Sequence, residues 1–512
     1  MLRKVINSKT KNSRIKNNSL RDVALVILSA VLLALPFNNG NLWVFAWFGF
    51  VPLFFVLENK SSAQAFMFSF LSGVIFWFFT IYWLANVTII GFIVFILYLG
   101  LYFGLFGVLI RRFYFPLLFA PSLWVVLEYI RSFLLTGFPW ALLGYSQYKN
   151  LPAIQIADIT GVWGVSFLVI IVNVYIYRLI RNRPRLQQAV IVPVIVLVSF
   201  GYGFYKINLA HSRISLSQLR ISVVQANIPQ ELKWDPKAKH YIMENYIRLT
   251  ETVSKERPDL IIWPEAASPC YLGEEKWCFN EISDLSYRIH RPLLLGTVTV
   301  DRGSYYNSVL FINGLSQEYQ LYHKIHLVPF GEYIPLRHIF TFLDTVVPIG
   351  DFSAGKEYIV FNIPDPASRT KDKFSVLICF EDVFPGLARN FVKNGAQFLV
   401  NITNDAWFGR TSSPYQHLSA SVFRAVENRV SLVRSANTGV SAFISPEGRI
   451  EAIFSDDKGR NIFVEGALTR ELKVFAAGKA FYTRFGDIFI FLLFIFLIYS
   501  IFRLFYIAKE RK

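Results

Sequence analysis

The feature that most constrains the fold is a series of long apolar runs in the first 207 residues, separated by short polar breaks. Each run approaches the length of about 20 residues that an α-helix needs to cross the hydrocarbon of a bilayer. A further apolar run, "FGDIFIFLLFIFLIYSIFRLFYI", lies near the C-terminus. We therefore expect eight transmembrane helices, at 23–38, 41–57, 63–84, 88–110, 114–133, 163–180, 188–207 and 485–507.

The composition agrees with a membrane protein, because 54% of the residues are hydrophobic and 50 are phenylalanine. The net charge of +17 could suggest nucleic-acid binding, but the placement of the basic residues argues against it. They collect in the N-terminal arm and in alternate breaks between the apolar runs, whereas the breaks near 38–41 and 84–88 carry none. Basic segments stay in the cytoplasm, so both termini are expected inside and residues 208–480 outside.

A basic arm before an apolar run could instead be a cleaved signal peptide. No small-residue cleavage site is apparent near Pro36, which favours an uncleaved first helix. The chain is thus expected to divide into a cytoplasmic arm at 1–22, a seven-helix membrane domain at 23–207, an outer domain at 208–480 and a C-terminal helix at 484–507. In the outer domain, strand-like runs alternate with helical stretches such as 239–256 and 413–428, which indicates a layered α/β domain.

Chemically active residues follow three of these strand-like runs. "IIWPEAASP" carries Glu265, "YHKIHLVPFGEYIP" carries Lys324 and Glu332, and "LICFED" carries Cys379 and Glu381. A carboxylate can take the thiol proton, the thiolate can attack a carbonyl carbon, and an ammonium can stabilise the resulting oxyanion. Taken singly, these residues also fit a structural ion pair, a turn cap and a buried core cysteine.

Together, "WPEAASP", "HKIHLVPFGEYIP", "CFEDVFP", "NDAWFG" and "RAVENRVSLVRSANTG" resemble the nitrilase superfamily of carbon–nitrogen hydrolases. With eight membrane helices and "NIPQELKW" at 227–234, the chain resembles the membrane-bound branch that N-acylates lipoproteins. The resemblance implies a polytopic α-helical membrane domain joined to a nitrilase-like αββα sandwich. It also implies a catalytic triad of Glu265, Lys324 and Cys379.

The reaction implied by this resemblance has two steps. Cys379 takes an acyl chain from a phospholipid as a thioester, and the chain then passes to the α-amino group of an N-terminal diacylglyceryl-cysteine. Glu265 is the expected base, and Lys324 is expected to support the oxyanion together with a backbone N–H near Phe380. Phe380 stands where we would expect tyrosine in many relatives, so a hydroxyl is missing there.

Further residues are assigned by the same resemblance. Glu332 and Glu381 are expected to orient Lys324 or to act as a second base. Trp234, Trp407 and Asn307 are expected to contact substrate. The implied partners are the phospholipid donor, the lipoprotein acceptor and the bilayer, with no nucleic acid, no cofactor and no metal, and the chain is expected to be a monomer. The implied location is the bacterial inner membrane, with the catalytic domain in the periplasm.

Two other functions fit parts of the sequence. A membrane-tethered amidase would release its acyl group to water. A transporter or receptor would bury paired charges within its helices, and the candidates are Glu128 and Arg131. These two lie near the outer end of their helix, which favours an anchor at the membrane interface.

Four smaller features remain open at this level. Cys270 and Cys278 are close enough in sequence to pair in an oxidising compartment, or they are two unpaired thiols. "HKIH" has metal-ligand spacing without an evident third ligand. Residues 134–162 either lie flat in the interface or pack as a plain loop. Residues 336–350, flanked by Gly331 and Gly350, are expected to form an apolar arm that gates lipid entry.

Overall fold

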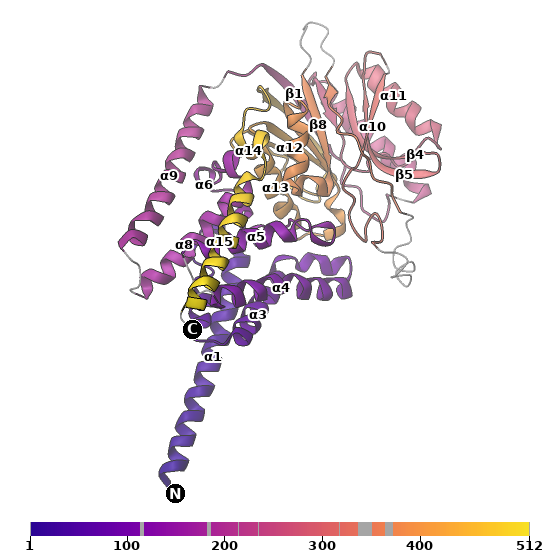
Figure 1. Cartoon of the computed structure of the whole chain (residues 1–512). Helices are drawn as coiled ribbons and strands as arrows, with labels where there is room; N and C mark the ends of the chain where they lie inside the picture. The colour runs from indigo at the N-terminus through magenta and orange to yellow at the C-terminus, as the bar shows by residue number, and fades with distance from the viewer. Residues whose placement is uncertain are drawn as a thin grey trace. The chain divides into compact units, whose positions relative to one another are not determined.

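The structure is a computed structural model that describes residues 2–112, 117–181, 186–212, 214–233, 235–316, 318–335, 351–363 and 372–510. It forms two compact units (Figure 1). The helical unit contains Met1–Ala153, Val162–Gly201 and Asp487–Lys512, and the sheet unit contains Ile154–Gly161 and Tyr202–Gly486. The domain boundaries expected from the sequence, at residues 22, 207 and 480, remain predictions.

Six stretches of the described chain are long and apolar enough to cross a membrane. They are Ser19–Asn38 in α1 (Leu2–Asn38), Gly40–Leu57, α3 (Ser62–Thr80), α4 (Ile89–Arg112), α8 (Val162–Ile180) and Ala189–Ala210 in α9 (Leu186–His211). The two other expected spans correspond to α5 (Phe119–Arg131), which has 13 residues, and to α15 (Ile488–Glu510). In α15 the apolar segment found is Ile488–Arg503. The count of eight therefore remains a prediction.

The expected helix at 41–57 is broken into two pieces, η1 (Gly40–Trp47) and α2 (Val51–Leu57). A proline stands in the first turn of α2, where its missing N–H costs nothing. The backbone N–H of Phe50, between the pieces, donates to Asn173 Oδ1 on α8 at 2.8 Å. A side-chain amide thus satisfies a polar group that a continuous helix would have satisfied itself.

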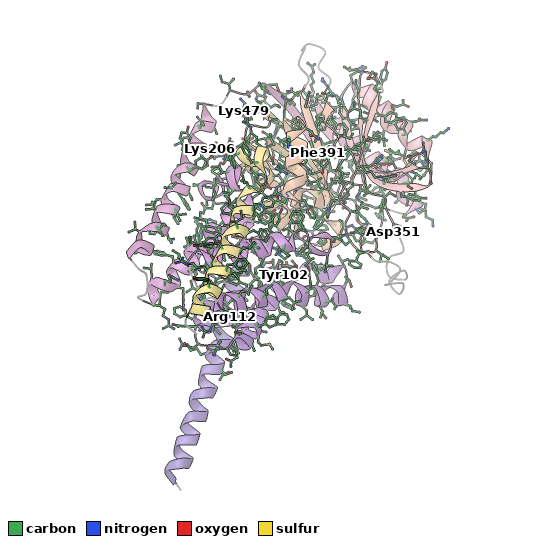
Figure 2. The ribbon with its side chains drawn as sticks, in the orientation of Figure 1. Tyr102, Arg112, Lys206, Asp351, Phe391 and Lys479 are labelled. Atoms are coloured by element: carbon green, nitrogen blue, oxygen red, sulfur yellow. A yellow bond between two sulfur atoms is a disulfide. The ribbon has the colours of Figure 1, made fainter. Side chains whose placement is uncertain are left out.

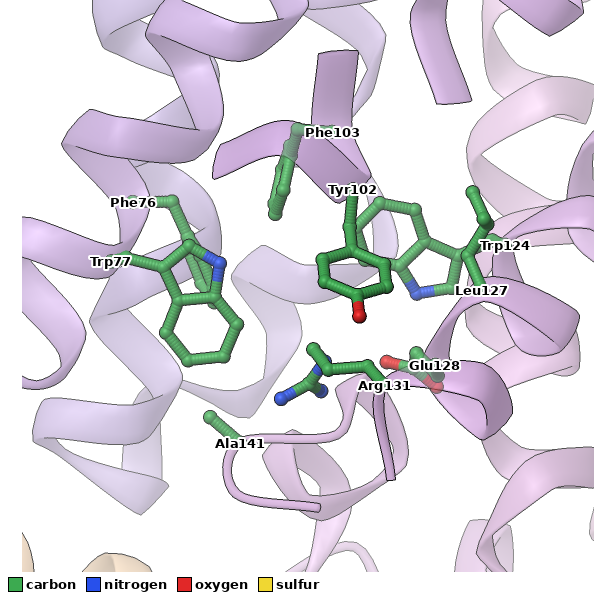
Figure 3. A pocket seen from close by; sticks show the side chains of 9 residues that line it. All are labelled: Phe76, Trp77, Tyr102, Phe103, Trp124, Leu127, Glu128, Arg131 and Ala141. Carbon is green, nitrogen blue, oxygen red and sulfur yellow. The ribbon is translucent and has the colours of Figure 1, made fainter. Parts of the chain in front are cut away.

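Residues 134–148 pack against the helical unit through two charged side chains of α5. Arg131 Nη1 donates to the carbonyl oxygens of Phe138 and Trp140 at 2.7 and 2.9 Å, and Glu128 Oε1 accepts from the N–H of Leu143 at 2.7 Å. Figure 3 shows both side chains pointing into a small pocket between aromatic rings. Glu128 and Arg131 are only 3% and 4% exposed, so both charges are buried within the helical unit, and an anchoring role at the membrane interface remains a prediction.

The 134–162 segment folds into a series of short helical turns. Its elements are η3 (Leu134–Thr136), η4 (Leu143–Gln147), α6 (Leu151–Ile154) and α7 (Ala157–Thr160). Trp140 and Tyr145 are 4% and 2% exposed. Of the two alternatives raised by the sequence, this burial supports the packed loop.

In the sheet unit, the described strands form two sheets. The first has the order β13-β1-β2-β4-β5-β6, with β3 paired to β4, and the second has the order β12-β11-β10-β9-β8-β7. The strands of the first sheet are β1 (Ser217–Gln225), β2 (Leu260–Ile262), β3 (Tyr271–Leu272), β4 (Leu293–Asp301), β5 (Ser304–Ile312), β6 (Tyr319–His323) and β13 (Gly466–Val474). Those of the second are β7 (Phe361–Asn362), β8 (Lys373–Ile378), β9 (Phe398–Thr403), β10 (Ser431–Ala436), β11 (Ala442–Ile444) and β12 (Ile450–Ile453).

The two sheets pack face to face, and helices cover their outer faces. Phe311 of β5 contacts Phe361 and Phe374 of the second sheet, each with ring centroids 5.6 Å apart. Apolar side chains of α10 (Lys239–Ser254) and α11 (Lys276–Ile289) share a buried core with the first sheet. α12 (Pro385–Lys393) and α13 (Ser413–Asn428) lie against the second sheet, and α14 (Phe481–Phe485) packs on both of these helices. This is the αββα sandwich that the sequence predicted.

Two details of the sheet unit bear on the site. Cys270 and Cys278 form a disulfide, which resolves the alternative left open by the sequence. Phe391 of α12, labelled in Figure 2, is fully buried, and its ring lies 5.5 Å from that of Tyr322 on β6. The hydroxyl of Tyr322 reaches the candidate active site.

Candidate active site

Glu265 follows β2 in a tight turn, and its carboxylate is held by three groups. Oε1 accepts from Asn307 Nδ2 at 2.9 Å and lies 3.6 Å from Lys324 Nζ, while Oε2 accepts from the N–H of Asn404 at 3.0 Å. The side chain of Glu265 is 10% exposed. A carboxylate in this setting has a fixed orientation and retains a path to a substrate.

Lys324 follows β6 and points into the same cluster. Its ammonium lies 2.9 Å from Glu332 Oε1, and its side chain is 1% exposed. Burial alone would lower the pKa of Lys324, but the Glu332 and Glu265 carboxylates raise it above its ordinary value. Lys324 therefore remains a cation throughout the physiological pH range.

Asn307 of β5 connects the two carboxylates. Its Nδ2 donates to Glu265 Oε1 at 2.9 Å and to Glu332 Oε1 at 2.6 Å, and its backbone carbonyl oxygen accepts from the N–H of Lys324 at 2.8 Å. The side-chain donors of Asn307 are thus engaged within the cluster. A direct contact between Asn307 and substrate remains a prediction.

Cys379 is the first residue of η7 (Cys379–Val383), directly after β8, and is partly exposed. Its φ of +50° is uncommon for a residue other than glycine and marks a sharp turn that presents the side chain. Desolvation and the Glu265 carboxylate raise the pKa of the Cys379 thiol, while Lys324 opposes the shift. The thiol is protonated at rest, so a reaction through the thiolate needs a base.

Glu381 is completely buried and binds mainly backbone N–H groups. Its carboxylate accepts from the N–H of Ile325 at 2.7 Å, of His326 at 3.1 Å and of Ile378 at 2.7 Å, and from the hydroxyl of Tyr322 at 2.8 Å. Desolvation outweighs these donors and raises the pKa of Glu381 to about 7. Glu381 thereby joins the segment that carries Lys324 to the turn that carries Cys379.

A second buried polar network lies behind Cys379. Arg434 of β10 donates to Asp405 Oδ2 at 3.1 Å and to Asp382 Oδ2 at 3.3 Å. His417 of α13 lies between the same two carboxylates, at 3.1 Å from Asp405 Oδ1 and 2.8 Å from Asp382 Oδ1. Its Nε2 is also 3.2 Å from the carbonyl oxygen of Cys379. This network fixes the backbone of the sharp turn.

The remaining candidates from the sequence are less completely defined. Phe380 lies next to the ring of Phe384, with centroids 5.2 Å apart. Trp407, in η8 (Asp405–Phe408), is 48% exposed and free to meet a ligand. Trp234 and the proposed arm at 336–350 lie outside the described residues. Within the described ranges, no His, Cys, Asp or Glu side chains form a group of three that could hold a metal ion.

Sequence reasoning missed several residues of this site. His417 and Arg434 lie on elements far from Cys379 in sequence, and no local pattern links them to it. Lys233 stands inside the motif "NIPQELKW", but nothing in that motif indicates that its ammonium is buried at the site. Asp382 and Asp405 stand in the motifs "CFEDVFP" and "NDAWFG", and their place in these motifs was the one feature of the sequence that could have indicated a role at the site.

The αββα sandwich and the buried carboxylates, ammonium and thiol at its strand ends define the class of carbon–nitrogen hydrolases. The sequence profile of that class, "Carbon-nitrogen hydrolase", matches residues 220–464. A second profile, "Apolipoprotein N-acyltransferase N-terminal domain", matches residues 29–175.

Whole-length relatives narrow the class further. The chain is 38% identical to an apolipoprotein N-acyltransferase of Geobacter metallireducens over 92% of each chain. It is 31% identical to one of Pasteurella multocida over 90% of this chain and 91% of the relative. The chain belongs to the apolipoprotein N-acyltransferase family. It is a membrane-bound acyltransferase rather than an amidase.

Proposed function

We propose that the chain transfers an acyl chain from a membrane phospholipid, through a thioester on Cys379, to the α-amino group of the N-terminal diacylglyceryl-cysteine of lipoproteins. The observation that carries this proposal is the cluster in which Glu265 lies 3.6 Å from Lys324, with both charges acting on the Cys379 thiol. The apolar helices of the same chain supply a reason for a lipid substrate, since its acyl chains never leave the bilayer.

In the first step, Glu265 takes the thiol proton of Cys379, and the thiolate attacks the ester carbonyl carbon of the phospholipid. Lys324 and a backbone N–H near Phe380 stabilise the tetrahedral oxyanion. The C–O bond of the ester then breaks. The departing lysophospholipid oxygen takes the proton from Glu265, which leaves the thioester and a regenerated carboxylate.

In the second step, the neutral α-amino group of the acceptor attacks the thioester carbonyl carbon. Glu265 takes a proton from the attacking nitrogen, and the C–S bond breaks. The proton passes from Glu265 to the departing thiolate, so the enzyme returns to its starting state. Water must be kept away from the thioester, because hydrolysis would waste the acyl group.

The two supporting glutamates receive different roles in this proposal. Glu332 contacts Lys324 directly at 2.9 Å and orients the ammonium. Glu381 binds the backbone on either side of the site and holds the Lys324 and Cys379 segments in register. Trp234 and Trp407 are proposed to contact substrate, and Phe380 is proposed to pack beside the nucleophile.

We also propose that the sheet unit faces the periplasm and that both termini are cytoplasmic. Basic residues in alternate breaks support this orientation. The Cys270–Cys278 disulfide supports it independently, since such bonds persist in oxidising compartments such as the periplasm. A monomer is the proposed state, because one chain supplies every group that the reaction uses.

The test uses purified full-length chain with phosphatidylethanolamine and a synthetic peptide that bears an N-terminal diacylglyceryl-cysteine. Mass spectrometry should detect the peptide with one added acyl chain, joined through an amide. The Cys379→Ala and Glu265→Gln variants should fail to form it. Release of free fatty acid without acylated peptide would contradict acyl transfer and favour hydrolysis.

A further inference from the structure

Lys233 is a second buried lysine at the candidate active site. It lies in the turn after β1, and it is 4% exposed. Its ammonium donates to the carbonyl oxygens of Glu265 and Ala266, both at 3.1 Å. Among the described residues, its hydrogen bonds thus go to two carbonyl groups and to no carboxylate. Burying an ammonium is costly, so this arrangement calls for a functional reason.

The two carbonyl groups belong to the turn that carries the expected base. Ala266 has a φ of +48°, a conformation that residues other than glycine rarely adopt. Strain of this kind persists where the surroundings hold it in place. A single ammonium between two successive carbonyl oxygens can fix this turn, and with it the direction in which the Glu265 side chain leaves the backbone.

The turn that bears Lys233 is tied to the other partner of Glu265 as well. Gln230, in the same turn, accepts from Asn404 Nδ2 at 2.8 Å. The backbone N–H of Asn404 in turn donates to Glu265 Oε2 at 3.0 Å. The segment 230–233 therefore supports Glu265 from its backbone side and, through Asn404, from its carboxylate side.

Lys233 also offsets negative charge at the site. Glu265 and Glu332 bring two negative charges, and Lys324 and Lys233 bring two positive charges. Glu381 bonds to backbone N–H groups and Tyr322, and Asp405 bonds to Arg434. When a proton moves from Cys379 to Glu265, a thiolate replaces a carboxylate and the balance is kept. Without Lys233, the same transfer would take place in a cluster with an excess negative charge.

We propose that Lys233 is a positioning residue for thioester formation, which fixes the turn bearing Glu265 through two carbonyl groups and keeps a second positive charge beside Cys379. This inference rests on the proposed acyl transfer. Burial lowers the pKa of Lys233 to about 8, while Glu265 and Cys379 act to raise it. The ammonium is therefore lost at a pH that an experiment can reach.

The experiment measures the first step alone, in full-length chain reconstituted into nanodiscs of phosphatidylethanolamine. Thioester formation on Cys379 is followed by rapid-quench mass spectrometry as a function of pH, without an amine acceptor. An acceptor amine would titrate near pH 8 itself, and its absence removes this ambiguity. The variants are Lys233→Met, which keeps the length of the side chain, and Lys233→Arg, which keeps the charge. Lys239→Met, at a partly exposed ion pair with Glu275, is the control.

For the wild type, we expect the rate to fall above a pH of about 8. Lys233→Met should slow thioester formation about 100-fold. It should also shift the rise of the rate on the acid side of the pH profile to higher pH, because one positive charge fewer faces the site. Lys233→Arg should recover much of the rate and abolish the alkaline limb, since arginine stays charged. Lys239→Met should behave as the wild type.

Two results would overturn the inference. One is a Lys233→Met variant with the wild-type rate and profile. The other is a Lys233→Arg variant that is as slow as Lys233→Met while its alkaline limb persists, which would show that the charge is not what matters. Wild-type protein that forms no adduct on Cys379 would instead refute the proposed function itself, and this inference with it.

Discussion

Glu332 and Glu381 bring two similar carboxylates to the candidate site, yet their contacts differ in kind. Glu332 faces mainly charged and amide side chains, with Lys324 Nζ at 2.9 Å and Asn307 Nδ2 at 2.6 Å, and accepts one backbone N–H, that of Val328 at 2.7 Å. Glu381 instead accepts from three backbone N–H groups and one hydroxyl. At the scale of single residues, one glutamate sets the direction of a charge and the other sets the position of the backbone.

Replacement of each glutamate by glutamine should separate these roles. Glu332→Gln removes the charge beside Lys324, so we expect thioester formation on Cys379 to slow by about 100-fold. Some stability should be lost as well, because the buried ammonium keeps only Glu265, at 3.6 Å, as a charged partner. Glu381→Gln replaces one acceptor oxygen by an NH₂ group, which then faces the backbone N–H groups that the carboxylate had bound. We therefore expect a loss of about 1–3 kcal/mol in the free energy of unfolding. Thermal unfolding in detergent and adduct formation measure both effects. Equal effects of the two substitutions on both quantities would contradict this division of roles.

The sequence located the principal residues of the site but not their supporting contacts. Glu265 and Cys379 each follow an apolar run, so their positions at strand ends could be predicted from the pattern alone, whereas Lys324 follows the half-exposed strand β6 and was assigned through the resemblance. The bonds from Asn404, Tyr322 and Lys233 depend on which strand ends meet, and that information is tertiary. Glu332 and Glu381 could not be told apart before the structure, because only their partners distinguish them.

At the scale of elements, β4 and the turn after β2 approach each other unusually closely. A Cβ atom added to Gly296 of β4 would lie 2.5 Å from the Cα of Glu265. Such a contact is too short to accommodate without a shift of backbone. The position of the expected base thus depends on a residue without a side chain on a neighbouring strand.

Gly296→Ala should therefore displace Glu265 and slow adduct formation on Cys379 by about 100-fold, since small errors in position are costly for catalysis. Gly386→Ala is the matched control, because an added Cβ there meets no atom within 4 Å. Alanine at Gly386 in α12 should leave the rate unchanged and raise helix stability slightly. A wild-type rate in Gly296→Ala would show that the close approach does not position the base.

The elements behind the nucleophile are joined by buried charges, which should respond to acid. Burial would raise the pKa of Asp405, but Arg434 and His417 lower it to about 2 from its ordinary 3.8. Because the folded state binds this proton less tightly, the stabilisation is present above pH 3.8 and is lost as the pH falls towards 2.

Asp405→Asn should therefore flatten the acid dependence of thermal stability in that range. It should also cost about 3–5 kcal/mol at neutral pH, since Arg434 is left with an incomplete set of partners. Thermal unfolding of both proteins as a function of pH measures both effects. If the variant lost stability with falling pH in the same way as the wild type, Asp405 would not be the source of the acid sensitivity.

Helices and strands were predicted well where buried residues recur with a clear periodicity along the sequence, and poorly at the edges of the sheets. The predicted helix at 413–428 matches α13 (Ser413–Asn428). The apolar sequence that follows α13 forms two strands, β10 and β11, because the chain turns between Ala436 and Ala442. The edge strands β6 and β13 were not predicted, since half-exposed sequences with many polar residues carry a weak pattern.

At the scale of the whole molecule, the orientation in the membrane is open to a direct measurement. We expect Lys255, an exposed residue of the sheet unit, to lie outside, and Asn59, an exposed residue between two apolar stretches, to lie inside. Each is replaced by cysteine in a chain that lacks its three native cysteines. A membrane-impermeant maleimide applied to intact spheroplasts should label Lys255→Cys only, and both variants after lysis. Labelling of Asn59→Cys before lysis would contradict the orientation.

The central claim is that one side chain carries the acyl group between two lipid substrates. Full-length chain mixed with phosphatidylethanolamine should gain the mass of a single acyl chain, located by peptide mapping at Cys379 and removed by hydroxylamine. The Cys379→Ala variant should gain no acyl chain. An adduct on another residue, or acylated acceptor formed without any adduct on Cys379, would contradict the account.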